Sequence, residues 1–217
     1  MELTLIDNVV YTRQLGLDTT IQKKSADLMY DLICDKFDSS IADGHSNFNE
    51  QIPITTKVYS KYNYFLYPVP GNYELYNKIK ETFYQCLKHS NWNVEPHYYI
   101  QAWLNYYKKG EYIDWHSHAE PSMKGWHGFY CVDVEPNSKT MYRFPDKEHI
   151  TNVQSKNDLM IVSPSNNDSH RSSEWNEETP RITIAFDIIP QSTLFAGARK
   201  ANNLSNTWKE LNHWIPL

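Results

Sequence analysis

Three histidines are the residues of this sequence whose types and spacing could do chemistry: His116 and His118, and His170 after 51 intervening residues. In an extended segment, residues i and i+2 leave the same side, so His116 and His118 could bind one ion. Neutral imidazole is a good ligand for divalent iron, and three facial protein ligands leave positions on the ion open. His170 follows a predicted strand, Leu159 to Val162, and a Ser163-Pro164-Ser165 turn. The three histidines are therefore the candidate metal ligands.

An arginine completes the pattern, because Arg181 follows His170 after ten residues and begins a run that alternates in polarity. On a strand, Arg181 and Thr183 share one face, and the apolar residues between and after them share the other. A planar guanidinium that faces a cavity is a favoured bidentate partner of a carboxylate, and Thr183 can donate a second hydrogen bond. The alternative is a surface ion pair with Glu177 or Glu178. Beside the histidines, we favour a site that holds a metal ion and a dicarboxylate together.

The order HxH, His and RxT resembles the Fe(II)/2-oxoglutarate dioxygenase superfamily, whose signature is HxD and His, followed after ten residues by RxS. Three further segments resemble its motifs NxYxxG, GxYYV and FPS: Asn105 to Gly110, Gly128 to Val132 and Ile161 to Ser165. The resemblance covers Tyr98 to Ile189. It is strongest to small oxygenases of bacteria and phages that are related to prolyl hydroxylases, several of which carry HxH.

This resemblance implies an iron- and 2-oxoglutarate-dependent dioxygenase, which uses O2 to hydroxylate a peptidyl or small-molecule substrate and releases succinate and CO2. His116 and His170 match the two metal histidines of the family. Arg181 and Thr183 match the pair that grips the distal carboxylate of 2-oxoglutarate. Cosubstrate contacts are also implied for Asn105 and Tyr107.

The sequence departs from the family at His118, which stands where the family has a carboxylate ligand. A neutral donor there leaves the metal site with one more positive charge. We favour His118 as the third ligand, with Asp114 and Glu120 as the alternative anionic ligands. Two other histidines, His97 and His127, are expected to be ordinary strand or loop residues. Two tryptophans near the motif suit a pocket wall and core packing equally well, Trp115 and Trp126.

The expected fold class is α+β, mainly β: a double-stranded β-helix, or jelly-roll, whose N-terminal helices buttress the major sheet. Helices are predicted from Asp18 to Phe37 and from Asn72 to Lys88 by their apolar spacing. From Tyr98 to Tyr107 the even positions are apolar and the odd positions can form hydrogen bonds, which predicts a strand with one face on helices and one on a wet cavity. Other strands are predicted at Leu3 to Val10, Ile113 to His118, Gly128 to Val134, Lys139 to Phe144, Leu159 to Val162 and Arg181 to Ile188.

The chain is interpreted as one domain, with supporting helices and outer strands in 1–97, the metal and cosubstrate core in 98–190 and a tail in 191–217. Asp38 to Lys61 is polar and turn-rich, which predicts a loop over one end of the fold. The tail is predicted to contain a short helix around Thr207 to Trp214.

Composition narrows the functional classes. The net charge is −5 and no long basic run exists, so a broad nucleic-acid interface is not indicated. Three widely spaced cysteines without a CxxC pair argue against a disulfide scaffold and for a reducing compartment. No segment approaches the roughly 20 apolar residues of a membrane helix, so no membrane partner and a cytoplasmic location are expected. The oligomeric state is not indicated.

Two alternative functions remain open at this point. One is a cupin-like dioxygenase that uses three histidines without 2-oxoglutarate. The other is a non-catalytic jelly-roll binding module whose histidines are structural or bind a passive metal ion. Arg181 separates these from the leading interpretation, because it has a clear role only if a dicarboxylate binds.

Overall fold

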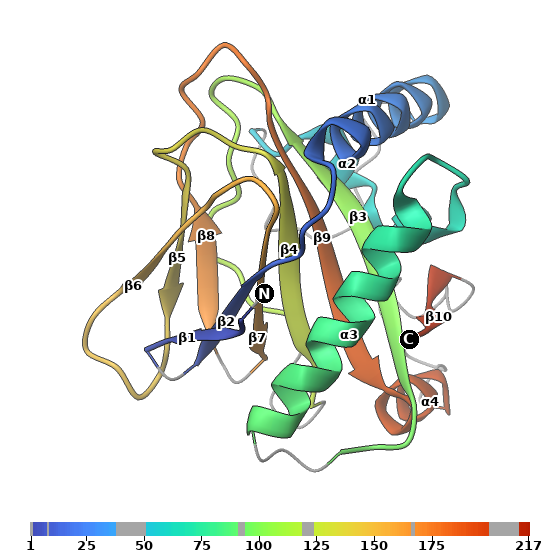
Figure 1. Ribbon diagram of the computed structural model, residues 1–217, viewed down its shortest axis with the longest axis vertical. Helices are drawn as coiled ribbons and strands as arrows, with labels where there is room; N and C mark the ends of the chain where they lie inside the picture. The colour runs from blue at the N-terminus through green and yellow to red at the C-terminus, as the bar shows by residue number, and fades with distance from the viewer. Residues whose placement is uncertain are drawn as a thin grey trace.

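Two antiparallel β-sheets lie face to face, and helices cover the outer face of the larger one (Figure 1). The computed structural model describes residues 2–7, 9–37, 51–90, 94–118, 124–165, 168–199 and 213–217. The larger sheet has seven strands, in the spatial order β1 (Thr4–Ile6), β2 (Val10–Gln14), β7 (Leu159–Pro164), β4 (Trp126–Asp133), β9 (Arg181–Pro190), β3 (Tyr98–Tyr107) and β10 (Ile215–Pro216). The smaller sheet has three, in the order β6 (Thr151–Gln154), β5 (Lys139–Arg143) and β8 (Ser169–Ser172).

The helical elements lie mainly in the first half of the described chain. They are α1 (Thr19–Lys36), α2 (Ile54–Lys57), α3 (Asn72–Ser90), α4 (Gln191–Arg199) and the 3-10 turns η1 (Tyr59–Lys61) and η2 (Tyr64–Leu66). Both long helices were predicted. Asp18 caps α1 by accepting hydrogen bonds from the amides of Thr20 and Ile21, which the first turn of a helix otherwise leaves without partners.

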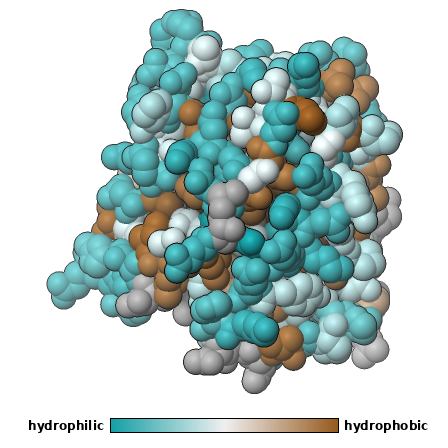
Figure 2. Space-filling model, in the orientation of Figure 1, coloured by the Kyte–Doolittle hydropathy of each residue, from teal (hydrophilic) through white to brown (hydrophobic). Residues whose placement is uncertain are grey.

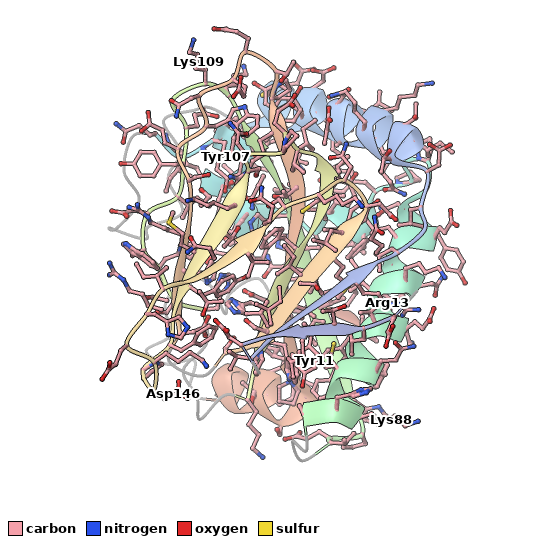
Figure 3. All side chains as sticks on the ribbon, turned by 60° about the vertical axis from the view of Figure 1, so that its left-hand side comes forward. Tyr11, Arg13, Lys88, Tyr107, Lys109 and Asp146 are labelled. Carbon is pink, nitrogen blue, oxygen red and sulfur yellow. The ribbon has the colours of Figure 1, made fainter. Side chains whose placement is uncertain are left out.

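Helix α3 packs on the larger sheet through residues spaced four apart. The buried side chains on this face are Leu75, Ile79, Phe83 and Leu87. The Phe83 ring lies 4.9 Å from that of Tyr98 and 5.7 Å from that of Trp126, so the helix meets two strands of the sheet. Arg13, on β2, points toward α3 and pairs with Glu81 at 2.9 Å (Figure 3). These contacts give α3 a supporting role.

The alternation predicted for β3 is confirmed. Its even residues, Ile100, Ala102 and Leu104, belong to the core beneath the helices. Its odd residues Trp103, Asn105 and Tyr107 line a cavity on the other face of the sheet. The face of the molecule in Figure 2 carries mostly hydrophilic residues, with apolar ones interspersed. The largest cluster of buried apolar side chains includes residues of α1, α3 and the larger sheet.

Several predicted elements differ from the structure. No strand forms over Ile113 to His118, where one isolated backbone bridge joins His116 to His170. The segment Leu3 to Val10 divides into β1 and the start of β2, because a turn at Asp7, with φ of 50°, reverses the chain. Neither β6 nor β8 was predicted, since four-residue strands show little alternation. Half-exposed β8 also mixes serine, histidine and arginine.

Two predicted segments fall partly outside the described residues. Within Asp38 to Lys61, the structure describes 51–61, where α2 and η1 form, so the loop prediction is wrong for that part. The helix predicted around Thr207 to Trp214 lies almost wholly outside the described residues, and the described helix α4 begins earlier, at Gln191.

Two expectations from composition concern disulfide bonds and membrane helices. All three cysteines are free thiols. Among the described helices, none is long and apolar enough to span a bilayer.

Asp158 ties the start of β7 to the connection between β2 and α1. Its carboxylate accepts hydrogen bonds from the amides of Gly16 (2.7 Å) and Leu17 (2.9 Å) and from the Tyr130 hydroxyl (3.2 Å). We expect Asp158→Ala to lower the free energy of unfolding by about 3 kcal/mol, because these amides lose an anionic acceptor and alanine is strained at the φ of 66° found here. Denaturant unfolding measures this change, with Asp146→Ala, at an exposed aspartate, as the control. Equal unfolding midpoints for the two variants would contradict the prediction.

Candidate functional site

A cavity of about 430 Å³ lies between the two sheets. Its walls come from β3, β4, β5, β8 and β9 and from the segment 113–118. Figure 3 shows side chains from both sheets filling the space between them, and the labelled Tyr107 belongs to one wall. The polar residues on the cavity wall include all the predicted site residues: Asn105, Tyr107, His116, His118, His170, Arg181 and Thr183.

The three predicted histidines come together in this cavity. His116, His118 and His170 each offer a ring nitrogen, and these nitrogens lie within 4.8 Å of one another. Backbone pairing brings two of them side by side: the His116 amide donates to the His170 carbonyl at 3.1 Å, and the His170 amide donates back at 2.9 Å. His118 follows two residues later and also lines this cavity. The arrangement therefore depends on the backbone pairing between His116 and His170, which joins the segment 113–118 to strand β8.

Two of these rings are oriented by partners at Nδ1. Nδ1 of His116 lies 2.8 Å from the carbonyl oxygen of Asp114, and Nδ1 of His118 lies 2.6 Å from Oδ1 of Asp187. A ring that donates through Nδ1 has its lone pair on Nε2, which is then available to a metal ion. For His170, the nearest carboxylate oxygen recorded is Oδ2 of Asp168, 3.8 Å from Nδ1.

The electrostatics of the cavity favour neutral imidazoles at two of the three positions. Burial and the neighbouring His118 lower the pKa of His116 to about 4. Burial and the adjacent imidazoles put the pKa of His170 well below its ordinary value. Burial also opposes the charged form of His118, but Asp187 outweighs it, so the pKa of His118 is raised. Neutral imidazole is the form that binds metal.

A second group in the same cavity was missed from the sequence. His127, Asp168 and His170 also bring ring nitrogens and a carboxylate oxygen within 4.8 Å of one another. Nε2 of His127 lies 2.6 Å from the Ser163 hydroxyl and 3.1 Å from Oδ2 of Asp168. His127 is a strand residue, as expected, but it lies buried on β4 beside the candidate ligands, which its sequence context did not indicate. Asp168 precedes His170 by two residues, a spacing that could have indicated it; no spacing marks His127.

The carboxylate alternatives to His118 receive no support from the described residues. The Asp114 side chain is 59% exposed, lies 3.8 Å from Arg171 and belongs to neither candidate metal group. It was expected to share the face of His116, but the segment is not a regular strand, so the alternation does not hold there. Glu120 lies outside the described residues.

Arg181 is a buried cation on the cavity wall. It is 4% exposed, its guanidinium carbon lies 4.4 Å above the Tyr107 ring, and its Nε and Nη1 atoms have no hydrogen-bond partner among the described residues. The predicted alternative, a surface ion pair, is wrong: Glu178 pairs with Lys109 at 2.5 Å, and Glu177 accepts from Asn137. Burial lowers the pKa of Arg181. An anion in the cavity would compensate this charge.

The register of β3 and β9 places the other candidate residues around Arg181. Tyr107 is directly opposite Arg181, and Asn105 is directly opposite Thr183. Asn105 is fixed by the hydroxyl of Thr56, which donates to its Oδ1 at 2.6 Å. The two paired strands thus place a phenol ring, a guanidinium, an amide and a hydroxyl next to one another on the cavity wall.

The two tryptophans near the histidines have different surroundings. Trp126 packs its ring against Phe83 and Tyr11, so it belongs to the core and also contributes to the cavity wall. Trp115 lies 3.8 Å beneath the guanidinium of Arg143. His97 is exposed at the approach to β3 and lies in neither metal group.

Comparison with known proteins agrees with this architecture. No protein-family model and no curated protein sequence matches the chain. Its structure is similar to AviO1 from Streptomyces viridochromogenes Tue57, with a TM-score of 0.59, 12% identity and coverage of 85% of this chain and 90% of that one. It is also similar to a prolyl hydroxylase from Trichoplax adhaerens, solved with a hypoxia inducible factor peptide, with a TM-score of 0.54, 8% identity and coverage of 86% of both chains.

Three other matches are shorter: a non-heme monooxygenase, a Pseudomonas putida prolyl-4-hydroxylase and a Burkholderia pseudomallei 2OG-Fe(II) oxygenase family protein. The chain spans about half of their length, 45%, 52% and 57% respectively, with TM-scores of 0.36, 0.36 and 0.40. The two longer matches carry the comparison. At 12% and 8% identity, these two matches show that the chain shares their fold.

Proposed function

We propose that the protein is an iron- and 2-oxoglutarate-dependent dioxygenase that hydroxylates a peptidyl or small-molecule substrate. His116, His118 and His170 hold the iron. Arg181 and Thr183 bind the distal carboxylate of 2-oxoglutarate, and Asn105 and Tyr107 complete its surroundings. The two facing sheets are interpreted as a double-stranded β-helix. A peptide substrate is among the options, because one similar structure is a prolyl hydroxylase with a peptide bound.

The observation that carries this proposal is the state of Arg181. A buried guanidinium whose Nε and Nη1 atoms find no partner in the described part of the chain costs free energy unless an anion compensates it. The same cavity holds the three histidines. A ligand with a carboxylate at one end and metal-binding oxygens at the other would satisfy both features, and 2-oxoglutarate is such a ligand. A cupin-like enzyme or a passive binding module leaves Arg181 without a role.

The protein residues bind, orient and shield the reactants. When bound, iron and 2-oxoglutarate supply the oxidising chemistry, in which O2 is consumed and succinate and CO2 are released. The Asp114 carbonyl lies at Nδ1 of His116 and the Asp187 carboxylate at Nδ1 of His118, so a proton on each Nδ1 would leave Nε2 to the metal ion. Tyr107 supports the guanidinium of Arg181 from one side. The helix-packed sheet and the smaller sheet limit the access of water to the cavity between them.

Ligand selectivity tests the proposal. We expect the manganese-loaded protein, titrated anaerobically in a calorimeter, to bind 2-oxoglutarate at least about 30-fold more tightly than 2-oxobutyrate. The two ligands share the 2-oxo acid end, and only 2-oxoglutarate has the distal carboxylate that would pair with Arg181. Leaving a buried charge unpaired costs about 2–5 kcal/mol.

The control is the same titration without metal, which should weaken 2-oxoglutarate binding because its 2-oxo acid end then lacks a partner. Equal affinities for the two ligands, or no binding of either, would contradict the proposal. Metal binding without 2-oxoglutarate binding would favour the cupin-like alternative instead.

A further inference from the structure

We propose that Asp187 is a positioning residue of the metal site: its carboxylate, held at the far ring nitrogen of His118, supplies from outside the ligand set the negative charge that a carboxylate ligand would supply within it. This inference rests on the proposed role of His116, His118 and His170 as metal ligands. It concerns His118, which stands where the family motif HxD has a carboxylate ligand.

The contact between the two residues is short and sheltered. Oδ1 of Asp187 lies 2.6 Å from Nδ1 of His118, and the side chains are only 24% and 14% exposed. A carboxylate with so little exposure acts on the neighbouring imidazole with little screening by solvent and salt. Asp187 makes no other ion pair among the described residues. Among the described residues, His118 is therefore the ionisable side chain recorded against this carboxylate.

Strand β9 places this carboxylate reliably. Asp187 lies on the same face as Arg181 and Thr183, at alternate positions of one strand. In the sheet it is directly opposite Gln101 on β3 and His127 on β4. A residue in the middle of three paired strands moves little, so it can fix the orientation of an imidazole that belongs to an irregular segment.

The three candidate ligands differ in what holds their Nδ1 atoms. Nδ1 of His116 lies 2.8 Å from a neutral partner, the carbonyl of Asp114, and Nδ1 of His170 lies 3.8 Å from the nearest recorded carboxylate oxygen, that of Asp168. His118 alone has a carboxylate within hydrogen-bonding distance. A carboxylate at Nδ1 fixes the tautomer and makes the ring a stronger donor through Nε2. It also leaves the site with the same formal charge as one in which the carboxylate binds the ion directly.

Metal titrations of point variants test this role. We expect Asp187→Asn to weaken zinc binding by about 10- to 100-fold, the range seen for such outer partners, and to shift the ligand-field spectrum of the cobalt-loaded protein. Asp187→Glu should recover part of the affinity, because it keeps the charge. Asp146→Asn, an exposed substitution of the same type, should bind zinc as the wild type does.

A double variant shows whether Asp187 acts through His118. In a His118→Ala background, Asp187→Asn should have little further effect on zinc affinity, because its partner is already gone. Wild-type affinity and an unchanged cobalt spectrum in Asp187→Asn would overturn the inference, as would an undiminished effect in the His118→Ala background. If the wild type binds metal but not 2-oxoglutarate, the proposed function fails and this inference stands; if it binds no metal, both fail.

Discussion

Arg181→Ala is expected to abolish detectable 2-oxoglutarate binding at cosubstrate concentrations that saturate the wild type. The guanidinium lies buried on the cavity wall, and removing one partner of a buried, hydrogen-bonded charge pair costs about 2–5 kcal/mol. At about 1.4 kcal/mol per factor of ten, this is roughly a 30-fold to several-thousand-fold loss of affinity. Arg181→Lys should recover only part of it, since an ammonium cannot form the two-pronged contact.

The stability of the same variant separates a ligand-binding role from a structural one. Without ligand, the wild-type Arg181 is a buried cation whose Nε and Nη1 atoms lack partners among the described residues. Its removal should therefore leave the Tm of the ligand-free protein unchanged or raise it. A large fall in Tm would indicate that Arg181 holds the fold together. Arg143→Ala, which removes an exposed guanidinium stacked on Trp115, is the matched control for cosubstrate affinity.

His170→Ala is expected to weaken metal binding by more than about 100-fold, because His170 belongs to both groups that could hold an ion. Loss of a direct ligand should exceed the roughly 10- to 100-fold effect of losing an outer partner. Equilibrium dialysis against iron(II) under anaerobic conditions, or zinc(II) in air, measures the change. His89→Ala provides a surface control, since His89 is exposed at the end of α3 and its ring contacts the Gln85 carbonyl.

His116→Ala decides which group binds the ion, because His116 belongs to only one of them. We expect it to weaken metal binding about as much as His170→Ala does. If His116→Ala binds the metal ion as tightly as the wild type and Asp168→Asn binds it more weakly, the ion is instead bound by His127, Asp168 and His170. His127→Ala is a poorer discriminator, because His127 is buried and contacts both Ser163 and Asp168.

Much of the architecture could be predicted because long, regular elements carry strong periodic signals. The 19 residues of α3 repeat apolar side chains every four positions, and the ten residues of β3 alternate strictly enough to show which face meets the cavity. The same alternation in β9 predicted that Arg181 and Thr183 share a face. Motif order also predicted that the histidines and the arginine share one site, and all four line the same cavity.

The parts that could not be predicted depend on contacts between segments far apart in the chain. His127 enters the histidine cluster because β4 lies between β7 and β9, and nothing local to its sequence indicates that. The segment at His116 pairs with β8 through a single bridge, so it lacks the hydrogen bonds that would make it a strand. The contact between Asp187 and His118 appears only when β9 is placed in the sheet.

One spectrum tests the central claim most directly. Iron(II) and 2-oxoglutarate added to the wild type without oxygen should produce a weak visible charge-transfer band, because that band requires both molecules to be bound together at one site. We predict that the band appears in the wild type, requires both additions, and is absent from Arg181→Ala at the same concentrations. A wild type that binds iron but shows no band, or an Arg181→Ala protein whose band equals that of the wild type, would contradict the account.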